Sequence, residues 1–334
     1  MSHFDPLVDN YYSSVIIPFS LYLILRKGNN LDSPFDSVII YVFSGTHNTA
    51  LVATFLKEEF EKREIPTQIV PLGKPTAPLR QPSEKSLVAI GYPIHAFNAP
   101  KPVLEEISKL KEAFENQKVF IFKVSGEPLK INDASSVSLF KILKRKNYCI
   151  FDEYHFLMPY NIWFRYSNEL ANHMHLYAKK QSKLVVEKLL NNRVEEPKRV
   201  ALRARLFGAL FKIQHPAAAL NGKLYTVDRK KCTLCGICEK GCPVGNIRIV
   251  ENKVTFHNRC AMCMYCSMYC PVDAINIGLL KFWKVNGPYN YVKMGNDLSL
   301  PFPFITKKTK GVKKLFVKHY EKLENELDKF NLKQ

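Results

Sequence analysis

Residues 37–43 (SVIIYVF) form an almost unbroken apolar run, and the chain after them changes to a helical spacing. Runs rich in β-branched and aromatic residues are typical of strands buried on both faces. After the small polar residues 44–49 (SGTHNT), apolar side chains recur from Leu51 to Phe60 at helical intervals, while Lys57 and Glu58 take the other face. The pattern predicts a strand, a tight turn and an amphipathic helix, which together begin an α/β unit.

Four more short apolar runs follow, and helical patterns lie between most of them. The runs are at 67–72, 86–92, 118–124 and 148–158, and the helical patterns are at 100–115, 135–146 and 167–192. Because parallel neighbours in a sheet need long crossovers, this alternation predicts a doubly wound parallel sheet. One crossover differs, since Pro75, Pro78 and Pro82 forbid a regular helix between the second and third runs, which predicts an irregular loop there.

The composition of the chain changes at about residue 193. We expect an N-terminal extension at 1–36, the α/β domain at 37–192, a basic linker at 193–221, a small cysteine-rich module at 222–278 and a basic tail at 279–334 that ends in a helix over 315–330. The tail carries KKTKGVKK at 307–314. A basic run of this kind is most often a solvated face, and no aromatic stacking pattern is interleaved with it, so we expect no nucleic-acid partner.

The charge balance favours an acidic partner. The 334 residues include 49 Lys and Arg against 30 Asp and Glu, a formal charge of +19. The apolar run from Val15 to Leu25 is 11 residues long and contains Pro18, whereas a helix needs about 20 apolar residues to span a bilayer. We interpret this run as a packing segment, with weak membrane-surface association, helped by Arg26 and Lys27, as the alternative. No basic residue precedes the run as in a signal peptide, and the clustered cysteines suggest a reduced setting, so we expect a cytoplasmic protein.

Eight of the nine cysteines form two matching runs, each ending in Cys-Pro. The first is Cys232, Cys235, Cys238 and Cys242, and the second, 28 residues later, is Cys260, Cys263, Cys266 and Cys270. Zinc and disulfides are the alternatives, but structural zinc usually takes separated Cys-x-x-Cys pairs, so the tandem runs favour two 4Fe–4S clusters. The spacing matches the bacterial ferredoxin arrangement, in which the fourth cysteine of each run ligates the other cluster. The expected sets are therefore Cys232, Cys235, Cys238 and Cys270 for one cluster, and Cys260, Cys263, Cys266 and Cys242 for the other.

Three further candidates favour structural roles. Cys149 lies in a strand pattern, which predicts a buried core thiol. His173 and His175 are two residues apart on a predicted helix and face different sides, so we do not expect them to share a metal ion.

The turn at 44–49 is a candidate phosphate cradle. Backbone amides and hydroxyls at a strand-to-helix turn favour an anion, but Ser44, Thr46 and Asn48 can equally cap the helix. The position of the turn favours a ligand, since doubly wound sheets bind ligands where the strand order reverses, at the carboxyl ends of strands. The segments 91–96 and 125–127 follow the third and fourth predicted strands.

With these motifs the chain resembles flavodoxin-like domains fused to a two-cluster ferredoxin, a family found mainly in anaerobic microbes. The resemblance rests on SGTHNT, on GYPIHAFNAPKPV, on MPYN at 158–161 and on the two cysteine runs. It implies a flavodoxin-like doubly wound sheet followed by a small α+β ferredoxin-like domain. It also implies an FMN site, with the phosphate on the turn and the isoalloxazine ring near the next three segments; the residues concerned are Ser44, Gly45, Thr46, His47, Asn48, Thr49, Tyr92, Pro93, His95, Ser125 and Gly126. Flavodoxin loops usually carry glycine where this chain has His47.

The expected function is electron transfer, with FMN exchanging single electrons with two 4Fe–4S clusters. An acidic ferredoxin, flavodoxin or their reductase is the expected partner, steered by the basic linker and tail. One alternative is an enzyme that reduces a small molecule at the flavin, with His95 or Tyr92 as proton donor. Another is an iron–sulfur protein whose flavin site is vestigial, or a binding module whose clusters are structural or sensory.

Overall fold

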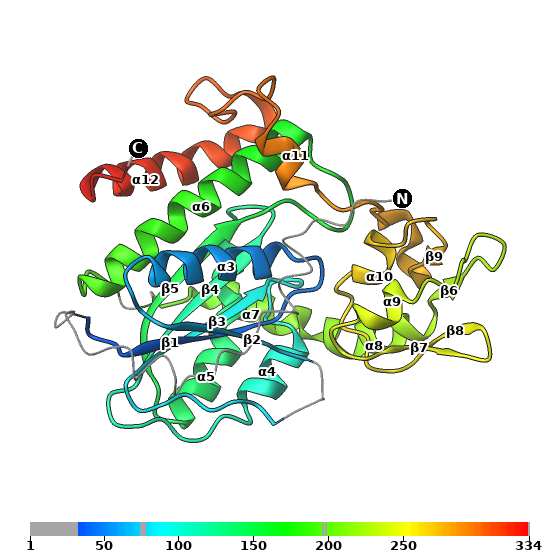
Figure 1. The fold of residues 1–334 in the computed structure, drawn as a ribbon, viewed down its shortest axis with the longest axis horizontal. Helices are drawn as coiled ribbons and strands as arrows, with labels where there is room; N and C mark the ends of the chain where they lie inside the picture. The colour runs from blue at the N-terminus through cyan, green and yellow to red at the C-terminus, as the bar shows by residue number, and fades with distance from the viewer. Residues whose placement is uncertain (1–32, 74–77, 196, 198, 333–334) are drawn as a thin grey trace.

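The protein has a five-stranded parallel sheet with a cysteine-rich module at one end (Figure 1). The computed structural model describes residues 33–73, 78–195, 197 and 199–332. The apolar run from Val15 to Leu25, and with it the suggested surface anchor, lies outside this part of the chain. In the described residues, no helix has the length and apolar character needed to cross a bilayer.

The strand order β2-β1-β3-β4-β5, with all neighbours parallel, is the flavodoxin order. The strands are β1 (Ser37–Val42), β2 (Thr67–Pro71), β3 (Ser86–Pro93), β4 (Lys118–Ser125) and β5 (Cys149–Leu157). This confirms the predicted flavodoxin-like doubly wound sheet. As expected, the described residues 78–85 before β3 contain no helix.

Helices cover both faces of the sheet. On one face, α3 (Asn48–Glu61) and α6 (Asn168–Leu190) pack with Val38, Ile40 and Val42, while α4 (Lys101–Ile107) and α5 (Val137–Arg145) pack with Ile39 and Tyr41 on the other. A 3₁₀ turn, η1 (Lys130–Ser136), precedes α5. Because each central strand is buried on both faces, its sequence is largely apolar, although β4 also contains the buried Lys123.

Residues 193–221, expected as a linker, are helical over most of their length. They contain α7 (Leu202–Leu210), the 3₁₀ turn η2 (Phe211–Ile213) and α8 (Gln214–Lys223), which lead from the sheet domain to the cysteine-rich module (Figure 1). The helix α7 packs against η1. This packing explains why the segment is helical although apolar residues occur on both of its faces.

The cysteine-rich module consists of short elements. They are β6 (Thr226–Val227), α9 (Ile237–Lys240), β7 (Ile247–Val250), β8 (Lys253–Phe256), α10 (Tyr265–Met268) and β9 (Ile275–Asn276), with β6 paired to β9 and β7 to β8, both antiparallel. Cys242, Val244 and Tyr265 belong to the same apolar core as Tyr41 and Val103, so the module and the sheet domain share buried surface.

The tail returns to the sheet domain. After η3 (Gly278–Trp283), α11 (Tyr291–Gly295) and η4 (Gly311–Lys313), the helix α12 (Lys314–Lys329) lies along α6, and its buried Phe316 and Leu327 belong to the same apolar cluster as Met174 of α6. Figure 1 shows α12 away from α9 and α10.

The prediction of a buried Cys149 is wrong. The side chain is exposed because Cys149 begins β5, which is the edge strand of the sheet. His173 and His175 lie inside the packing around α6, where the His173 ring accepts a hydrogen bond from the Phe304 amide and the His175 ring stacks on Tyr291.

Candidate iron–sulfur and flavin sites

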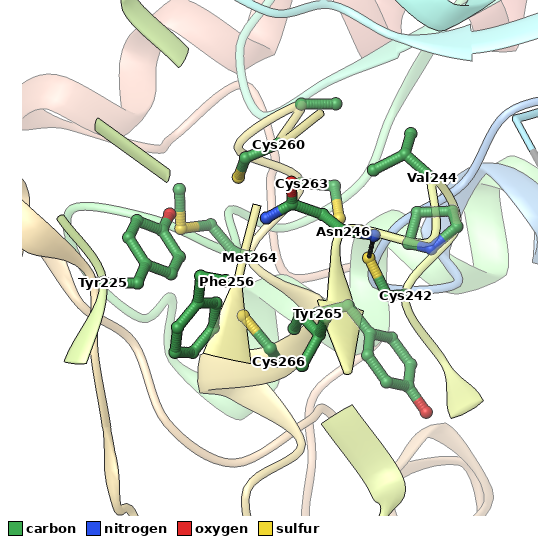
Figure 2. A pocket seen from close by; sticks show the side chains of 13 residues that line it. Tyr225, Cys242, Val244, Asn246, Phe256, Cys260, Cys263, Met264, Tyr265 and Cys266 are labelled. Atoms are coloured by element: carbon green, nitrogen blue, oxygen red, sulfur yellow. Dashed lines mark hydrogen bonds between the residues drawn. The ribbon is translucent and has the colours of Figure 1, made fainter. Parts of the chain in front are cut away.

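The eight clustered cysteines line two separate cavities. One cavity is bordered by Cys232, Cys235, Cys238 and Cys270, and the other by Cys242, Cys260, Cys263 and Cys266 (Figure 2). Each cavity therefore takes three cysteines from one run and the fourth from the other run. Apolar side chains complete the walls, among them Ile237 and Val254 around the first cavity and Val244 and Phe256 around the second.

The 28-residue repeat in the sequence is also a repeat in the backbone. Left-handed φ angles of 54° and 49° occur at Leu234 and Met262, between the first two cysteines of each run. Gly236 and Met264, again 28 residues apart, have φ angles of 78° and 64°. These turns wrap each loop around its cavity, so that three sulfur atoms of one loop border the same space.

Backbone amides donate to the sulfur atoms at matching positions. The Asn246 amide donates to Cys242 Sγ over 3.2 Å (Figure 2), and the Ala274 amide donates to Cys270 Sγ, also over 3.2 Å. The Met262 amide donates to Cys260 Sγ over 3.4 Å. Donors of this kind stabilise charged sulfur and adjust the potential of a cluster that it binds.

Burial makes free thiolates costly in both cavities. Burial and the neighbouring Cys235 raise the pKa of Cys238 to about 11, and burial raises the pKa of Cys263 further still. These two thiols would therefore be neutral at pH 7 in the absence of metal, whereas bound iron would supply the positive charge that deprotonates them.

The turn at 44–49 packs directly against the second cysteine loop. A Cβ atom at Gly45 would lie 2.4 Å from Cys263 Cβ and 2.6 Å from Cys263 O. The His47 ring meets the rings of Tyr265 and Tyr269, with centroids 5.7 Å and 5.3 Å away, and burial lowers its pKa to about 4. His47 has φ 67°, the left-handed conformation that glycine adopts without strain. In this turn His47 therefore keeps the glycine conformation and adds a ring to the contact between the domains.

The other side chains of the turn have intramolecular partners. Ser44 Oγ accepts from the Ala50 amide at the start of α3, and Thr46 Oγ1 accepts from Asn161 Nδ2 at 2.8 Å. Asn48 donates to Pro159 O and accepts from the Tyr291 hydroxyl, while Thr49 is buried in the first turn of α3.

The segments after β3 and β4 are closed as well. Tyr92 is fully buried, and its hydroxyl lies 3.0 Å from Ser136 Oγ. Ser125 Oγ lies 2.7 Å from His155 Nε2, and a Cβ at Gly126 would be 2.8 Å from the Tyr160 ring. Pro93 ends β3, and the backbone amide of His95 donates to Asn98 O.

His95 also borders a third cavity of about 260 Å³ between α4, α8 and the second cysteine loop. Its lining includes His215, Lys101, Arg259 and Cys260. Of the residues expected around a flavin ring, His95 lines this cavity and the others do not, and the cavity lies beside the second cysteine loop.

Comparison with known proteins supports the cysteine-rich module directly. Residues 225–248, which contain the first cysteine run, match the family model described as a 4Fe–4S binding domain. No curated protein matches the chain. The strand order of the sheet and the match of residues 225–248 together establish the architecture of the chain. The chain joins a flavodoxin-like domain to a ferredoxin-type domain.

Three solved structures resemble parts of the chain at low sequence identity. Rubredoxin oxygen:oxidoreductase from Desulfovibrio gigas shares 14% identity at a TM-score of 0.32, covering 49% of this chain and 38% of its own. A flavodoxin from the domain Archaea shares 11% identity at a TM-score of 0.29, covering 46% and 98%. A flavone reductase shares 8% identity at a TM-score of 0.34, covering 66% and 80%. This chain thus spans well under half of the first of these proteins.

The flavodoxin-like domain does not fit FMN at the expected place. In the turn that was expected to bind the phosphate, Cys263 packs against Gly45, and the hydroxyl of Thr46 already accepts a hydrogen bond from Asn161. The buried Tyr92 and the Tyr160 ring over Gly126 leave the expected ring position filled by protein. The residues of the turn therefore pack against the cysteine-rich module or bond to the start of α3, while Tyr92, Ser125 and Gly126 contact other residues of the sheet domain.

A flavin titration tests whether the turn at 44–49 is closed to FMN. Because the turn is covered, adding FMN to the purified protein should give no saturable change in flavin fluorescence at micromolar concentration. Stoichiometric quenching that is abolished in Thr46→Asp, where a carboxylate would face the phosphate, would contradict the closed site.

The residues that close the turn carry little local signal in the sequence. Asn161 lies in the MPYN stretch on which the resemblance was based, but its contacts with Thr46 and with Cys263 O join positions more than 100 residues apart. Tyr265 and Tyr269 directly precede Cys266 and Cys270, so the local pattern indicates metal ligation and gives no sign of the contact that their rings make with His47.

Proposed function

We propose that the protein is a single-electron carrier that holds two 4Fe–4S clusters with crossed ligands, on a flavodoxin-like domain that serves as scaffold. The observation that supports this best is the division of the cysteines between the two cavities, each lined by three cysteines of one run and the last of the other. Each cluster would accept one electron and pass one on, with no net chemical change in the protein. Each cluster would therefore take its fourth ligand from the other cysteine run, so both runs must fold together to complete either site.

Apolar walls suit such a carrier. Cys242 and Cys263 are buried and the walls around them are apolar, so water has little access to the cluster. Restricted water and the amide donors to sulfur are the protein's means of setting a cluster potential. The Cys235 side chain is exposed, which places the first cluster closer to solvent and to a redox partner.

We also propose that the partner is an acidic redox protein that docks beside the first cysteine run. Arg229, Lys230 and Lys231 are exposed and directly precede Cys232. The lysines at 307–314 instead lie just before α12 or at its first residue, and α12 lies against α6 and away from α9 and α10 (Figure 1). Electron transfer needs the partner near a cluster, so the first group is the better candidate for docking.

Charge-reversal variants distinguish the contributions of these two basic groups to partner docking. Changing Arg229, Lys230 and Lys231 to Glu should slow electron exchange with an acidic ferredoxin severalfold more than the same change at Lys307, Lys308 and Lys314, measured by stopped flow. The difference should shrink as salt rises, because exposed charges are screened beyond about 10 Å at 0.1 M salt. Equal effects of the two triple variants, or a rate that salt leaves unchanged, would contradict docking at this site.

A second candidate function is supported by the third cavity. Its wall includes Cys260 and the two imidazoles of His95 and His215, so a small molecule bound there would lie beside the second cluster. The protein would then be a small-molecule reductase that takes electrons from a cluster. Reduction of an added acceptor at a rate that saturates with its concentration would favour this enzyme over the carrier.

A further inference from the structure

An exposed apolar stripe runs along α7 and α8. Its members recur every three, four or seven residues, and their side chains are between 63% and 72% exposed: Leu202, Leu206, Leu210, Ile213 and Leu220. Residues at this spacing share one face of a helix. A row of large apolar side chains on the surface marks an interaction site, whereas single exposed residues do not.

The opposite face of these helices is anchored to the rest of the protein. Asn98 Nδ2 donates to Gly208 O at 3.0 Å, and the Phe97 ring contacts the rings of Phe207 and Phe211 at 5.5 Å and 5.3 Å. In α8, a Cβ at Gly222 would lie 2.1 Å from Cys260 Cβ. The stripe is therefore the outward face of a fixed pair of helices.

A second element extends the apolar surface. The Leu279 amide donates to Asn221 Oδ1 at 2.9 Å, and Asn221 Nδ2 donates to Ile277 O, which holds the start of η3 beside α8. Leu279 and Phe282 of η3 are both exposed. The exposed apolar surface therefore includes an aromatic side chain as well as aliphatic ones.

Positive charge accompanies the stripe. Residues 197–227 contain no Asp or Glu, whereas Arg203, Arg205, Lys212 and Lys223 are exposed along the same helices. Arg205, Lys212 and Lys223 follow one another at intervals of 7 and 11 residues, which places them on one side of the stripe. Leucine and phenylalanine on one face with lysine and arginine beside them is the composition of helices that lie in a membrane interface.

We propose that this surface of α7, α8 and η3 binds an anionic lipid bilayer. The apolar side chains would enter the boundary between headgroups and acyl chains, and the flanking basic side chains would reach lipid phosphates. Charge complementarity favours this occupant over a second copy of the chain, because a symmetric pair would bring two sets of Arg205, Lys212 and Lys223 together. The anchored inner face means that binding requires no rearrangement of the cysteine loops.

Vesicle flotation of the full-length protein tests this surface. We expect binding to phosphatidylcholine vesicles with roughly 30% phosphatidylglycerol, little binding to phosphatidylcholine alone, and a loss as salt rises. The variant Leu206→Asp/Leu210→Asp should lower the bound fraction by about tenfold or more. Leu298→Asp/Val312→Asp is the matched control, since Leu298 is 99% and Val312 is 90% exposed outside the stripe, and it should bind as the unaltered protein does.

Several outcomes would overturn the proposal. Equal binding by the stripe variant and the unaltered protein would do so, as would equal loss in the control. Loss in Leu21→Asp/Leu23→Asp but not in the stripe variant would assign the contact to the N-terminal apolar run. If the unaltered protein sediments as a dimer and the stripe variant as a monomer, the surface is a self-association site. If the surface binds an acidic protein but no vesicles, it is a protein-docking site. Unchanged iron content in each variant would show that the variant is folded.

Discussion

Replacing Cys242 with alanine should remove the cluster of the second cysteine loop and leave the other cluster in place. Cys242 lines the cavity of Cys260, Cys263 and Cys266, although it belongs to the first run in the sequence. Losing one of four ligands at a buried site leaves an iron without its thiolate, so the iron content should fall from about eight per chain to about four. The exposed Cys149 supplies the control, and Cys149→Ala should keep all of the iron.

Paired variants separate crossed from uncrossed ligation without any assignment of spectra. With crossed ligands, Cys242→Ala/Cys263→Ala damages one cluster twice and should retain about four irons, while Cys242→Ala/Cys235→Ala damages both and should retain almost none. Uncrossed ligation predicts the reverse order. Iron and sulfide analysis of the two double variants, prepared anaerobically side by side, distinguishes the two arrangements.

Gly45→Ala should weaken the contact between the two domains and the second cluster together. The new Cβ would lie 2.4 Å from Cys263 Cβ and 2.9 Å from Cys263 Sγ, so Cys263 or the turn must move. Overpacking of this kind costs about 1–3 kcal/mol. We expect a lower melting temperature of the holoprotein and faster loss of iron from the cluster that Cys263 ligates.

Gly295→Ala is the matched control for this variant, because a Cβ at Gly295 meets no atom within 4 Å. Its melting temperature should stay near that of the unaltered protein. If Gly45→Ala also leaves melting temperature and iron loss unchanged, the turn is open and the closed flavin site is disproved.

The flavodoxin-like sheet could be predicted because the local sequence of its strands is typical of buried strands. Residues 37–43 and 118–124 consist mainly of β-branched and aromatic residues, and such runs form strands when helices cover both faces. The residue pattern of a strand does not, however, specify the position of that strand in the sheet. Cys149 looks like a core residue inside YCIF, and it is exposed only because β5 occupies the edge of the sheet.

The helices of 193–221 were missed for a related reason. Apolar residues occur on both faces of α7, since Phe207 packs on Phe97 while Leu206 and Leu210 stay exposed, so the segment lacks the clear polar face of an ordinary surface helix. Its inner partner, η1, lies more than 60 residues earlier in the chain. The sequence alone therefore indicated a linker.

Of the candidate sites, the cysteine sites could be predicted from local sequence, whereas the surroundings of the proposed flavin site could not. The cysteine runs are local repeats whose spacing itself specifies the chemistry, and the 28-residue period reappears in the φ angles of Leu234 and Met262. The flavin prediction relied instead on a turn whose surroundings come from elsewhere in the chain. Gly45 and Cys263 are 218 residues apart, and no local pattern indicates that they touch.

The most direct test of the account combines metal analysis with the resonance spectrum of one anaerobic preparation. Iron, sulfide and flavin content should be measured on the purified full-length protein, followed by the electron paramagnetic resonance spectrum after reduction with dithionite. A two-cluster carrier with a closed flavin site should contain about eight irons and eight sulfides per chain and no stoichiometric flavin, and its reduced spectrum should be that of two interacting clusters. About four irons together with one tightly bound FMN would contradict both the two-cluster carrier and the closed flavin site.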